Sequence, residues 1–218
     1  YADRLHTVTH VHNQPLVPRN RVKGVTERID MMGSVVIPLH EDEVEAAVEE
    51  LLDMSVEAIA VLLVYSYINP AHEKKVSEIA RRVLEKRNKS VPVVLSSDTA
   101  PIMREYSRLN SVILQAYAAE RCRSQLLKVE EKAKEQGYKH NLLTMLSYGG
   151  LVDIRYPHLY ETLISGPIGG MLGAKYVGET LGINDIVCSD MGGTSFDVAV
   201  IRSRAEEPIY LWINDGAV

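Results

Sequence analysis

The chain has 218 residues, of which 46% are hydrophobic and 24% are charged, a composition typical of a globular protein with a buried core. Its formal net charge of -5 argues against broad binding to nucleic acid or anionic membranes. Two cysteines are too few for a disulfide framework, and the apolar run at 59–64 is too short to span a bilayer, so we expect a cytoplasmic protein. Because the sequence begins with Tyr1 rather than Met, we also expect a piece of a longer polypeptide.

The first half of the chain has the pattern of alternating strands and helices. After a polar, proline-broken stretch at 1–24, "VTERID" and "SVVIPL" predict two short strands around Met32–Gly33. Apolar residues recur at helical spacing in 41–54, and a second helix is expected from Pro70 to about Lys86. The segments "EAIAVLLVY" and "VPVVLS" read as strands on either side of that second helix. This order indicates an α/β fold with parallel pairing.

A long helix separates the two halves of the sequence. No Gly or Pro interrupts the stretch from about Arg104 to Gln136, which is longer than most globular helices, so we expect it to join two lobes. Next come a strand in "NLLTML" and a helix in "SGPIGGMLGAKYVGETLG". Two further strands, "DIVCSDM" and "TSFDVAVI", are joined by a glycine pair at 192–193.

That glycine pair predicts a two-residue turn, because both central residues can adopt positive φ. The register would place Asp190 opposite Ser195 and Cys188 opposite Asp197, with all four side chains on one face. The two carboxylates, Asp190 and Asp197, would suit a hydrated Mg²⁺. The alternative is an ordinary hairpin in which Asp190 caps the turn.

Backbone N–H groups in this turn would also suit a phosphate, since glycines let a ligand approach closely. The candidate ligand-binding residues here are Gly192, Gly193, Thr194 and Ser195. Ser165 and Gly166 open a helix whose N-terminus could face an anion, although close packing of a glycine-rich helix on a sheet is the alternative. Gly149 and Gly150 follow a strand, where open α/β sheets bind ligands, or form a plain turn.

The run D-M-G-G-T-S-F-D after an apolar strand resembles the phosphate loop of the actin, sugar-kinase and heat-shock-chaperone ATPases. More closely, the chain resembles the hydantoinase A/5-oxoprolinase family, which includes the ATP-dependent acetone and acetophenone carboxylases. The motifs that carry this resemblance are "PLVPRNRVKGVTERID", "NPAHE", "REYSRLNSVILQAY", "SYGGL", "SGPIGG" and "DMGGTSFDVAVI". Ile168 and Phe196 differ from the small residue and the threonine that hydantoin-cleaving members more often have, and "IRYPHLYETLISGP" is more similar to the acetone-carboxylase branch.

The resemblance implies an incomplete actin/hexokinase-like (ribonuclease H-like) ATPase fold with two lobes joined by the long helix. Residues 1–125 would belong to the N-terminal hydantoinase/oxoprolinase domain, and residues 126–218 would begin the ATPase domain with its second phosphate loop. The family's first phosphate loop and its adenosine-binding segment have no counterpart in the sequence. We therefore expect the isolated chain to be inactive.

The implied cofactors are ATP and Mg²⁺ (or Mn²⁺), with Asp190 and Asp197 as metal-binding residues. The implied function is activation of a small carbonyl or amide substrate by phosphorylation, as in acetone carboxylase. An ATP-dependent hydantoinase or 5-oxoprolinase that hydrolyses a cyclic amide is the second reading, and a non-catalytic scaffold is the third. The expected partners are the remainder of the polypeptide and a hydantoinase B-like subunit. No residue stands out as a general base.

Overall fold

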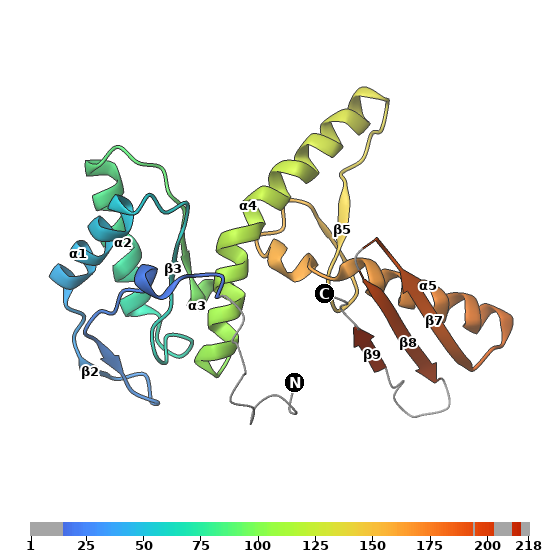
Figure 1. Cartoon of the computed structure of the whole chain (residues 1–218), viewed down its shortest axis with the longest axis horizontal. Coiled ribbons are helices and arrows are strands. Elements are labelled where there is room, and N and C mark those ends of the chain that lie inside the picture. Colours follow the sequence, from blue (N-terminus) through green and yellow to red (C-terminus); the bar gives the residue numbers. More distant parts are fainter. Residues whose placement is uncertain (1–14, 194, 203–210, 215–218) are drawn as a thin grey trace, which may run out of the picture. The chain divides into compact units, whose positions relative to one another are not determined.

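The computed structural model describes residues 15–193, 195–202 and 211–214. The chain divides into two compact units, Tyr1–Glu120 and Arg121–Val218, and the division falls inside one helix, α4 (Glu105–Glu135) (Figure 1). The helix runs unbroken for 31 residues, which confirms the prediction of a single long helix. The domain boundary expected after residue 125 also lies within α4.

The described part of the first unit begins with a short 3₁₀ turn, η2 (Arg19–Arg21), and an antiparallel hairpin of β1 (Arg28–Ile29) and β2 (Val35–Ile37). At the hairpin turn, the carboxylate of Asp30 accepts the backbone N–H groups of Met32 and Ser34. Gly33 has a φ of 83°, a conformation that a side chain would disfavour. The two strands predicted around Met32–Gly33 are therefore present.

The remainder of this unit has the predicted alternation of helices and strands. The elements are α1 (Glu41–Asp53), β3 (Ile59–Val61), α2 (Ala71–Lys86), β4 (Val93–Leu95) and the short α3 (Ser96–Thr99). Strands β3 and β4 pair in parallel, as predicted. Strand β3 is shorter than the predicted 57–65, because the backbone of Leu63 bonds to side chains and Tyr65 has a φ of 56°.

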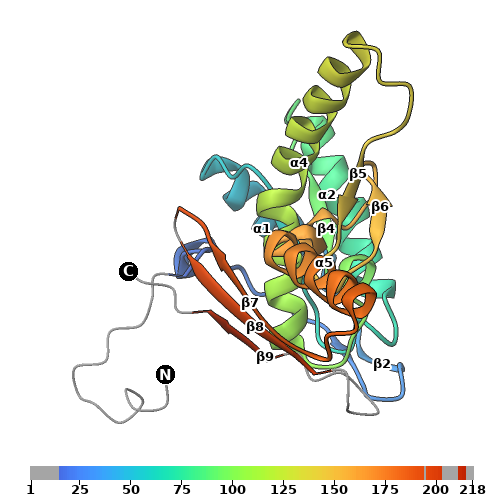
Figure 2. The ribbon, with the colours of Figure 1, turned by 90° about the vertical axis from the view of Figure 1, so that its right-hand side faces the viewer.

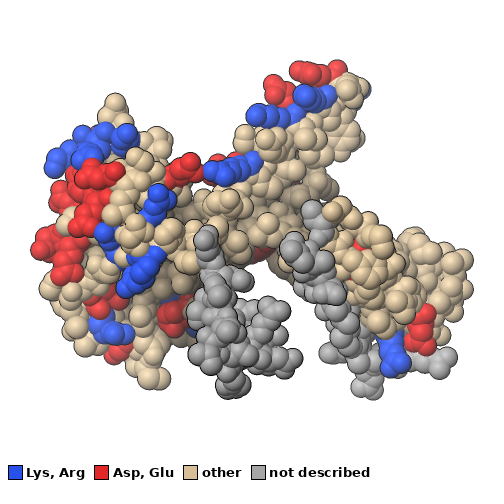
Figure 3. All heavy atoms as spheres, viewed as in Figure 1, with Lys and Arg blue, Asp and Glu red and all other residues tan. Residues whose placement is uncertain are grey.

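Helices α1 and α2 bury their apolar faces in one core with the two parallel strands. The buried residues of this core are Val44, Val48, Leu52, Ile59, Val61, Val76, Ile79, Ala80, Val83, Leu84 and Leu95. On the solvent side, acidic residues of α1 form ion pairs with basic residues of α2 and with Arg87, the residue directly after α2. Figure 3 shows these charges crowded over the two helices.

The second unit contains the hairpin of β5 (Leu143–Met145) and β6 (Leu151–Asp153), the 3₁₀ turn η3 (Leu159–Thr162) and α5 (Ser165–Leu181). Three antiparallel strands follow, β7 (Asp185–Met191), β8 (Phe196–Arg202) and β9 (Leu211–Asn214). Helix α5 lies across one face of this sheet (Figure 2).

The core of the second unit lies between α5 and the sheet. It consists of Met171, Ala199 and Ile201, with Ile168, Ala174, Ile186 and Cys188 packed against them. The mixture of helices with parallel and antiparallel strands confirms the α/β class. Among the helices that the structure describes, none combines the length and apolar character needed to cross a membrane.

Candidate functional site

The hairpin between β7 and β8 differs from its predicted register. Asp190 pairs with Asp197, and Cys188 pairs with Ala199, so the predicted pairs Asp190–Ser195 and Cys188–Asp197 are wrong. The turn spans four residues, closed by a 3.0 Å hydrogen bond from the N–H of Gly192 to the carbonyl of Ser195. Neither glycine of the pair has the positive φ that a two-residue turn requires, which explains the wider turn.

The corrected register places the two carboxylates directly opposite each other. Side chains alternate along a strand, so Cys188 and Asp190 on β7 share a face with Asp197 and Ala199 on β8. Asp190 is exposed, whereas Asp197 is 6% exposed. Ser195 does not face Asp190, but its hydroxyl donates to Oδ2 of Asp197 over 3.2 Å.

One buried oxygen of this carboxylate pair has no hydrogen-bond partner among the described residues. Oδ1 of Asp197 is buried and accepts no hydrogen bond from the described residues. Leaving a buried acceptor unpaired costs about 1–3 kcal/mol, more when the group is charged. The position is therefore poorly suited to structural support alone and well suited to a ligand that brings a donor or a cation.

A pocket of about 240 Å³ adjoins this carboxylate pair, between the sheet and the beginning of α5. Four of the lining residues come from the first two turns of α5, and the others, including both carboxylates, come from β7 and β8. The lining residues are Pro167, Ile168, Gly170, Met171, Cys188, Ser189, Asp190, Asp197, Val198 and Ala199. The positive end of a helix and two carboxylates thus meet in one concave site.

The structure brings together part of the predicted set. Asp190 and Asp197 line the pocket, and Ser165 and Gly166 immediately precede its first lining residue on α5. Gly192 and Gly193 form the turn at the end of β7, and Thr194 lies outside the described residues. Whether these residues bind a ligand remains a prediction.

Gly149 and Gly150 do not line this pocket. They form the turn of the β5–β6 hairpin with φ values of 87° and 88°, as in the plain-turn alternative. A Cβ on Gly149 would come within 3.1 Å of Leu172, so this turn packs closely on the flank of α5.

The two carboxylates fit the requirements of Mg²⁺. Among the described residues, no three His, Cys, Asp or Glu side chains cluster as a metal cage. Mg²⁺ is commonly held by one or two carboxylates, with waters and phosphate oxygens completing its octahedron. Asp190 and Asp197 supply two carboxylates, and no described residue donates a hydrogen bond to Oδ1 of Asp197.

Sequence reasoning missed a second polar cluster near the start of α5. The hydroxyl of Tyr148 donates to Oε2 of Glu161 over 2.8 Å, and that of Tyr156 donates to the same oxygen over 3.1 Å. The hydrogen bond between Tyr148 and Glu161 raises the pKa of Tyr148 to about 12, so the Tyr148 phenol stays a donor at neutral pH. Burial, with the same carboxylate, raises the pKa of Tyr156. The residues lie in the noted motifs "SYGGL" and "IRYPHLYETLISGP", but no spacing rule predicts that they meet.

The model of the Hydantoinase/oxoprolinase family matches residues 108–210, and that of the Hydantoinase/oxoprolinase N-terminal region matches residues 2–84. The acetone carboxylase beta subunit of Xanthobacter autotrophicus is 46% identical over 201 residues, covering 92% of this chain and 28% of the relative.

Solved structures that resemble the chain include an acetone carboxylase and a caprolactamase. One is a nucleotide-free acetone carboxylase from work on ATP-dependent acetone carboxylation, with a TM-score of 0.89 at 41% identity. This match covers 100% of the present chain and 32% of the acetone carboxylase chain. The other, an ATP-dependent caprolactamase from Pseudomonas jessenii, has a TM-score of 0.77 at 27% identity. This match covers 89% of the present chain and 28% of the caprolactamase chain.

The chain therefore spans only about a third or less of these proteins. Within that span, the likeness extends through both compact units and includes the hairpin with Asp190 and Asp197. From the two family models and these likenesses together, we conclude that the chain belongs to the hydantoinase/oxoprolinase family.

Proposed function

We propose that the chain is part of a cytoplasmic, ATP-dependent enzyme subunit and that the pocket beside Asp190 and Asp197 is half of its ATP–Mg²⁺ site. The proposal includes an actin/hexokinase-like ATPase fold for the complete protein. Support comes from the ATP dependence stated for both similar structures and from the glycine turn between two strands.

The facing pair Asp190 and Asp197 is the observation that carries this proposal. Like charges directly opposite on neighbouring strands destabilise a sheet, because their Cβ atoms lie only about 4.5–5.5 Å apart. Such a pair beside a pocket is reasonable where a divalent cation offsets the repulsion. A hairpin of purely structural role gains nothing from the arrangement.

Each part of the site then has a role derived from its position. Asp190 and Asp197 would hold the Mg²⁺. The N–H of Gly192 is engaged with the carbonyl of Ser195, but the two glycines put no side chain in the way of an approaching phosphate. The N-terminal end of α5 favours negative charge in the pocket. When bound, ATP with Mg²⁺ supplies the transferable phosphoryl group, and the protein contributes positioning and charge stabilisation.

For the substrate, we propose a small carbonyl compound that is activated by phosphorylation before carboxylation. The 46% identity to an acetone carboxylase subunit supports this class. Hydrolysis of a cyclic amide is the second candidate, supported by the likeness to the caprolactamase structure. A non-catalytic scaffold is the third candidate.

The proposed partners are a hydantoinase B-like subunit and the remainder of the polypeptide.

The discriminating experiment uses the complete protein, purified with its partner subunits. Consumption of ATP is measured with acetone and bicarbonate, with caprolactam or 5-oxoproline, and without substrate. Stimulation by acetone with bicarbonate is expected. Stimulation only by the cyclic amides would replace the carboxylase proposal by the hydrolase. Absence of both nucleotide binding and turnover would leave the scaffold reading.

A further inference from the structure

The entry into α5 is a conformationally unfavourable segment. Ile164, the residue before the helix, has a φ of 65°, a region that β-branched residues rarely adopt. Such conformations persist where surrounding contacts hold them, and they cluster at functional sites. The contacts that hold Ile164 therefore also determine where the first turn of α5 begins.

Ser147 provides the backbone part of this support. Its N–H donates to the carbonyl of Glu161 over 2.6 Å. Its hydroxyl lies within hydrogen-bonding distance of two carbonyl oxygens, those of Glu161 and Leu163. Ser147 follows β5, so the β5–β6 hairpin is tied to the segment that leads into α5.

Glu161 provides the side-chain part. One carboxylate oxygen accepts both the Tyr148 and the Tyr156 hydroxyl, so residues from the hairpin turn and from the loop after β6 meet there. The ring of Tyr156 also contacts His158, with the ring centroids 5.5 Å apart. Glu161 is thus fixed through both its backbone and its side chain.

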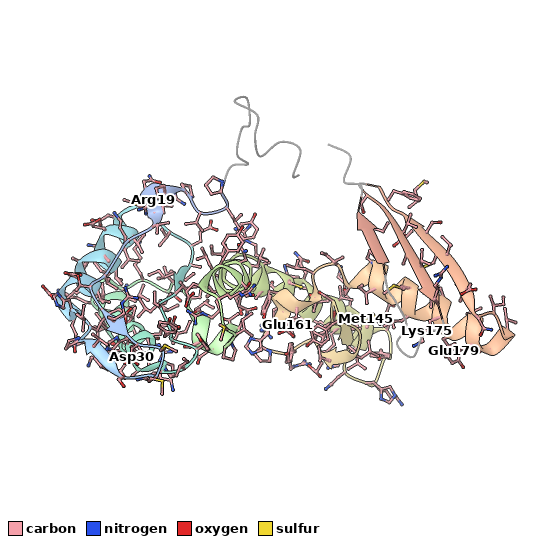
Figure 4. The ribbon with its side chains drawn as sticks, turned by 90° about the horizontal axis from the view of Figure 1, so that it is seen from below. Arg19, Asp30, Met145, Glu161, Lys175 and Glu179 are labelled. Atoms are coloured by element: carbon pink, nitrogen blue, oxygen red, sulfur yellow. The ribbon has the colours of Figure 1, made fainter. Side chains whose placement is uncertain are left out.

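The hairpin also packs directly on α5. A Cβ on Gly169 would lie 3.0 Å from the sulfur of Met145, and one on Gly149 would lie 3.1 Å from Leu172. Figure 4 labels Met145 and Glu161, both of which lie beside the beginning of α5. A shift of the hairpin would therefore displace the helix.

We propose that Tyr148 and Glu161 are positioning residues that hold the first turn of α5 in place against the phosphate pocket. This inference rests on the proposed function of that pocket. The first turns of α5 supply Pro167 and Ile168 to the pocket lining, whereas Tyr148 and Glu161 do not line it. Their effect on nucleotide binding is indirect and passes through the helix.

Tyr148→Phe is the primary test, because Tyr148 is 71% exposed and loss of its hydroxyl leaves the core unchanged. Tyr176→Phe is the matched control, since Tyr176 lies on α5 and is 72% exposed. In the complete protein without nucleotide, we expect backbone amides of residues 163–170 to exchange hydrogen about five- to tenfold faster in Tyr148→Phe. Mg²⁺–ATP should bind it about five- to tenfold more weakly, with an unchanged melting temperature. Tyr176→Phe should match the wild type.

A second pair of variants separates hydrogen bonding from charge. Glu161→Gln keeps an oxygen that can accept both hydroxyls, so it should retain most of the nucleotide affinity, whereas Glu161→Ala should lose about as much as Tyr148→Phe. Equal losses of nucleotide affinity in Glu161→Gln and Glu161→Ala would overturn the positioning role in favour of a charge effect. Wild-type exchange and affinity in Tyr148→Phe would overturn it entirely. Faster exchange at 163–170 in a protein that binds no nucleotide would keep the hairpin–helix coupling but reject the proposed function and, with it, the positioning role in nucleotide binding.

Discussion

Glu73 of α2 and Arg108 of α4 hold the two backbone polar groups of one residue, Leu63. Oε1 of Glu73 accepts the N–H of Leu63 over 2.9 Å, and Nη2 of Arg108 donates to the carbonyl of Leu63 over 2.6 Å. Both charged residues are fully buried, and the Arg108 guanidinium lies 5.2 Å from the ring centroid of Tyr67. The carboxylate of Glu73 also accepts hydrogen bonds from Ser66, Ser96 and Ser97.

This arrangement predicts that Glu73→Gln strongly destabilises the first unit. The amide nitrogen would face a hydrogen-bond donor, and one of the two buried charges that hold the backbone of Leu63 would be lost. A loss of about 3 kcal/mol is expected from removing one partner of a buried charged network. Urea unfolding would measure it, with Glu78→Gln on the exposed side of the same helix as the control. A change as small as the control's would show that Glu73 is not needed for stability.

Asp190→Asn should lower the ATP-dependent activity of the complete protein about a hundredfold, because one carboxylate fewer weakens Mg²⁺ positioning. The fold should be retained. Without Mg²⁺, the melting temperature should be unchanged or slightly higher, since the repulsion with Asp197 is relieved. Steady-state ATP turnover and calorimetry with and without Mg²⁺ measure these effects.

Asp185→Asn supplies the matched control for that experiment. Asp185 begins the same strand, β7, and pairs with Arg202 at the end remote from the turn. The charge change is identical, but activity should stay near the wild-type value. Normal turnover and metal dependence in Asp190→Asn would return the turn to the status of an ordinary hairpin.

Glu130 predicts a pH-dependent contribution to the stability of the second unit. Hydrogen bonds from Arg155, the backbone N–H of Leu142 and Lys134 lower its pKa from 4.5 to about 2. Because the folded pKa lies below the unfolded one, the contribution is full above about pH 4.5 and is lost as the pH falls toward 2.

The measurement compares the urea unfolding midpoints of the wild type and Glu130→Gln at pH 7 and pH 3. The difference should be large at pH 7 and clearly smaller at pH 3. Glu131→Gln, at the exposed neighbouring position, should change the midpoint little at either pH. An equal difference at both values would exclude the carboxylate's ionisation as the cause.

Two glycines of α5 are expected to respond oppositely to alanine. A Cβ on Gly178 would meet Ile186 of β7 at 2.1 Å and the carbonyl of Ile183 at 3.2 Å, so Gly178→Ala should destabilise by about 1–2 kcal/mol through forced repacking. Gly173 has open space, so Gly173→Ala should stabilise by about 0.5–1 kcal/mol. Thermal unfolding of both variants measures this. Similar effects of both would contradict close packing at Gly178.

Local sequence pattern was sufficient for the four long helices that the structure describes, whereas the short α3 and the 3₁₀ turns were not predicted. The spans of α1, α2 and α4 follow from apolar spacing and from the absence of Gly and Pro, because helical hydrogen bonds join residues only four apart. The strand–helix–strand order also predicted the parallel pairing of β3 with β4. Six motifs spread along the chain, including the one around Asp190 and Asp197, identified the family without knowledge of the fold.

The sequence by itself thus determined these four long helices, the α/β class and the family, since these depend on local periodicity and on residue identities within short segments. Only the tertiary structure decided that Asp190 faces Asp197, because the same two glycines permit turns of different length and their backbone conformation selects one. It also decided that Tyr148 and Tyr156 meet at Glu161, and that Glu73 and Arg108 meet at Leu63. Such contacts join residues that are far apart in the chain, and the requirement to satisfy buried polar groups selects them.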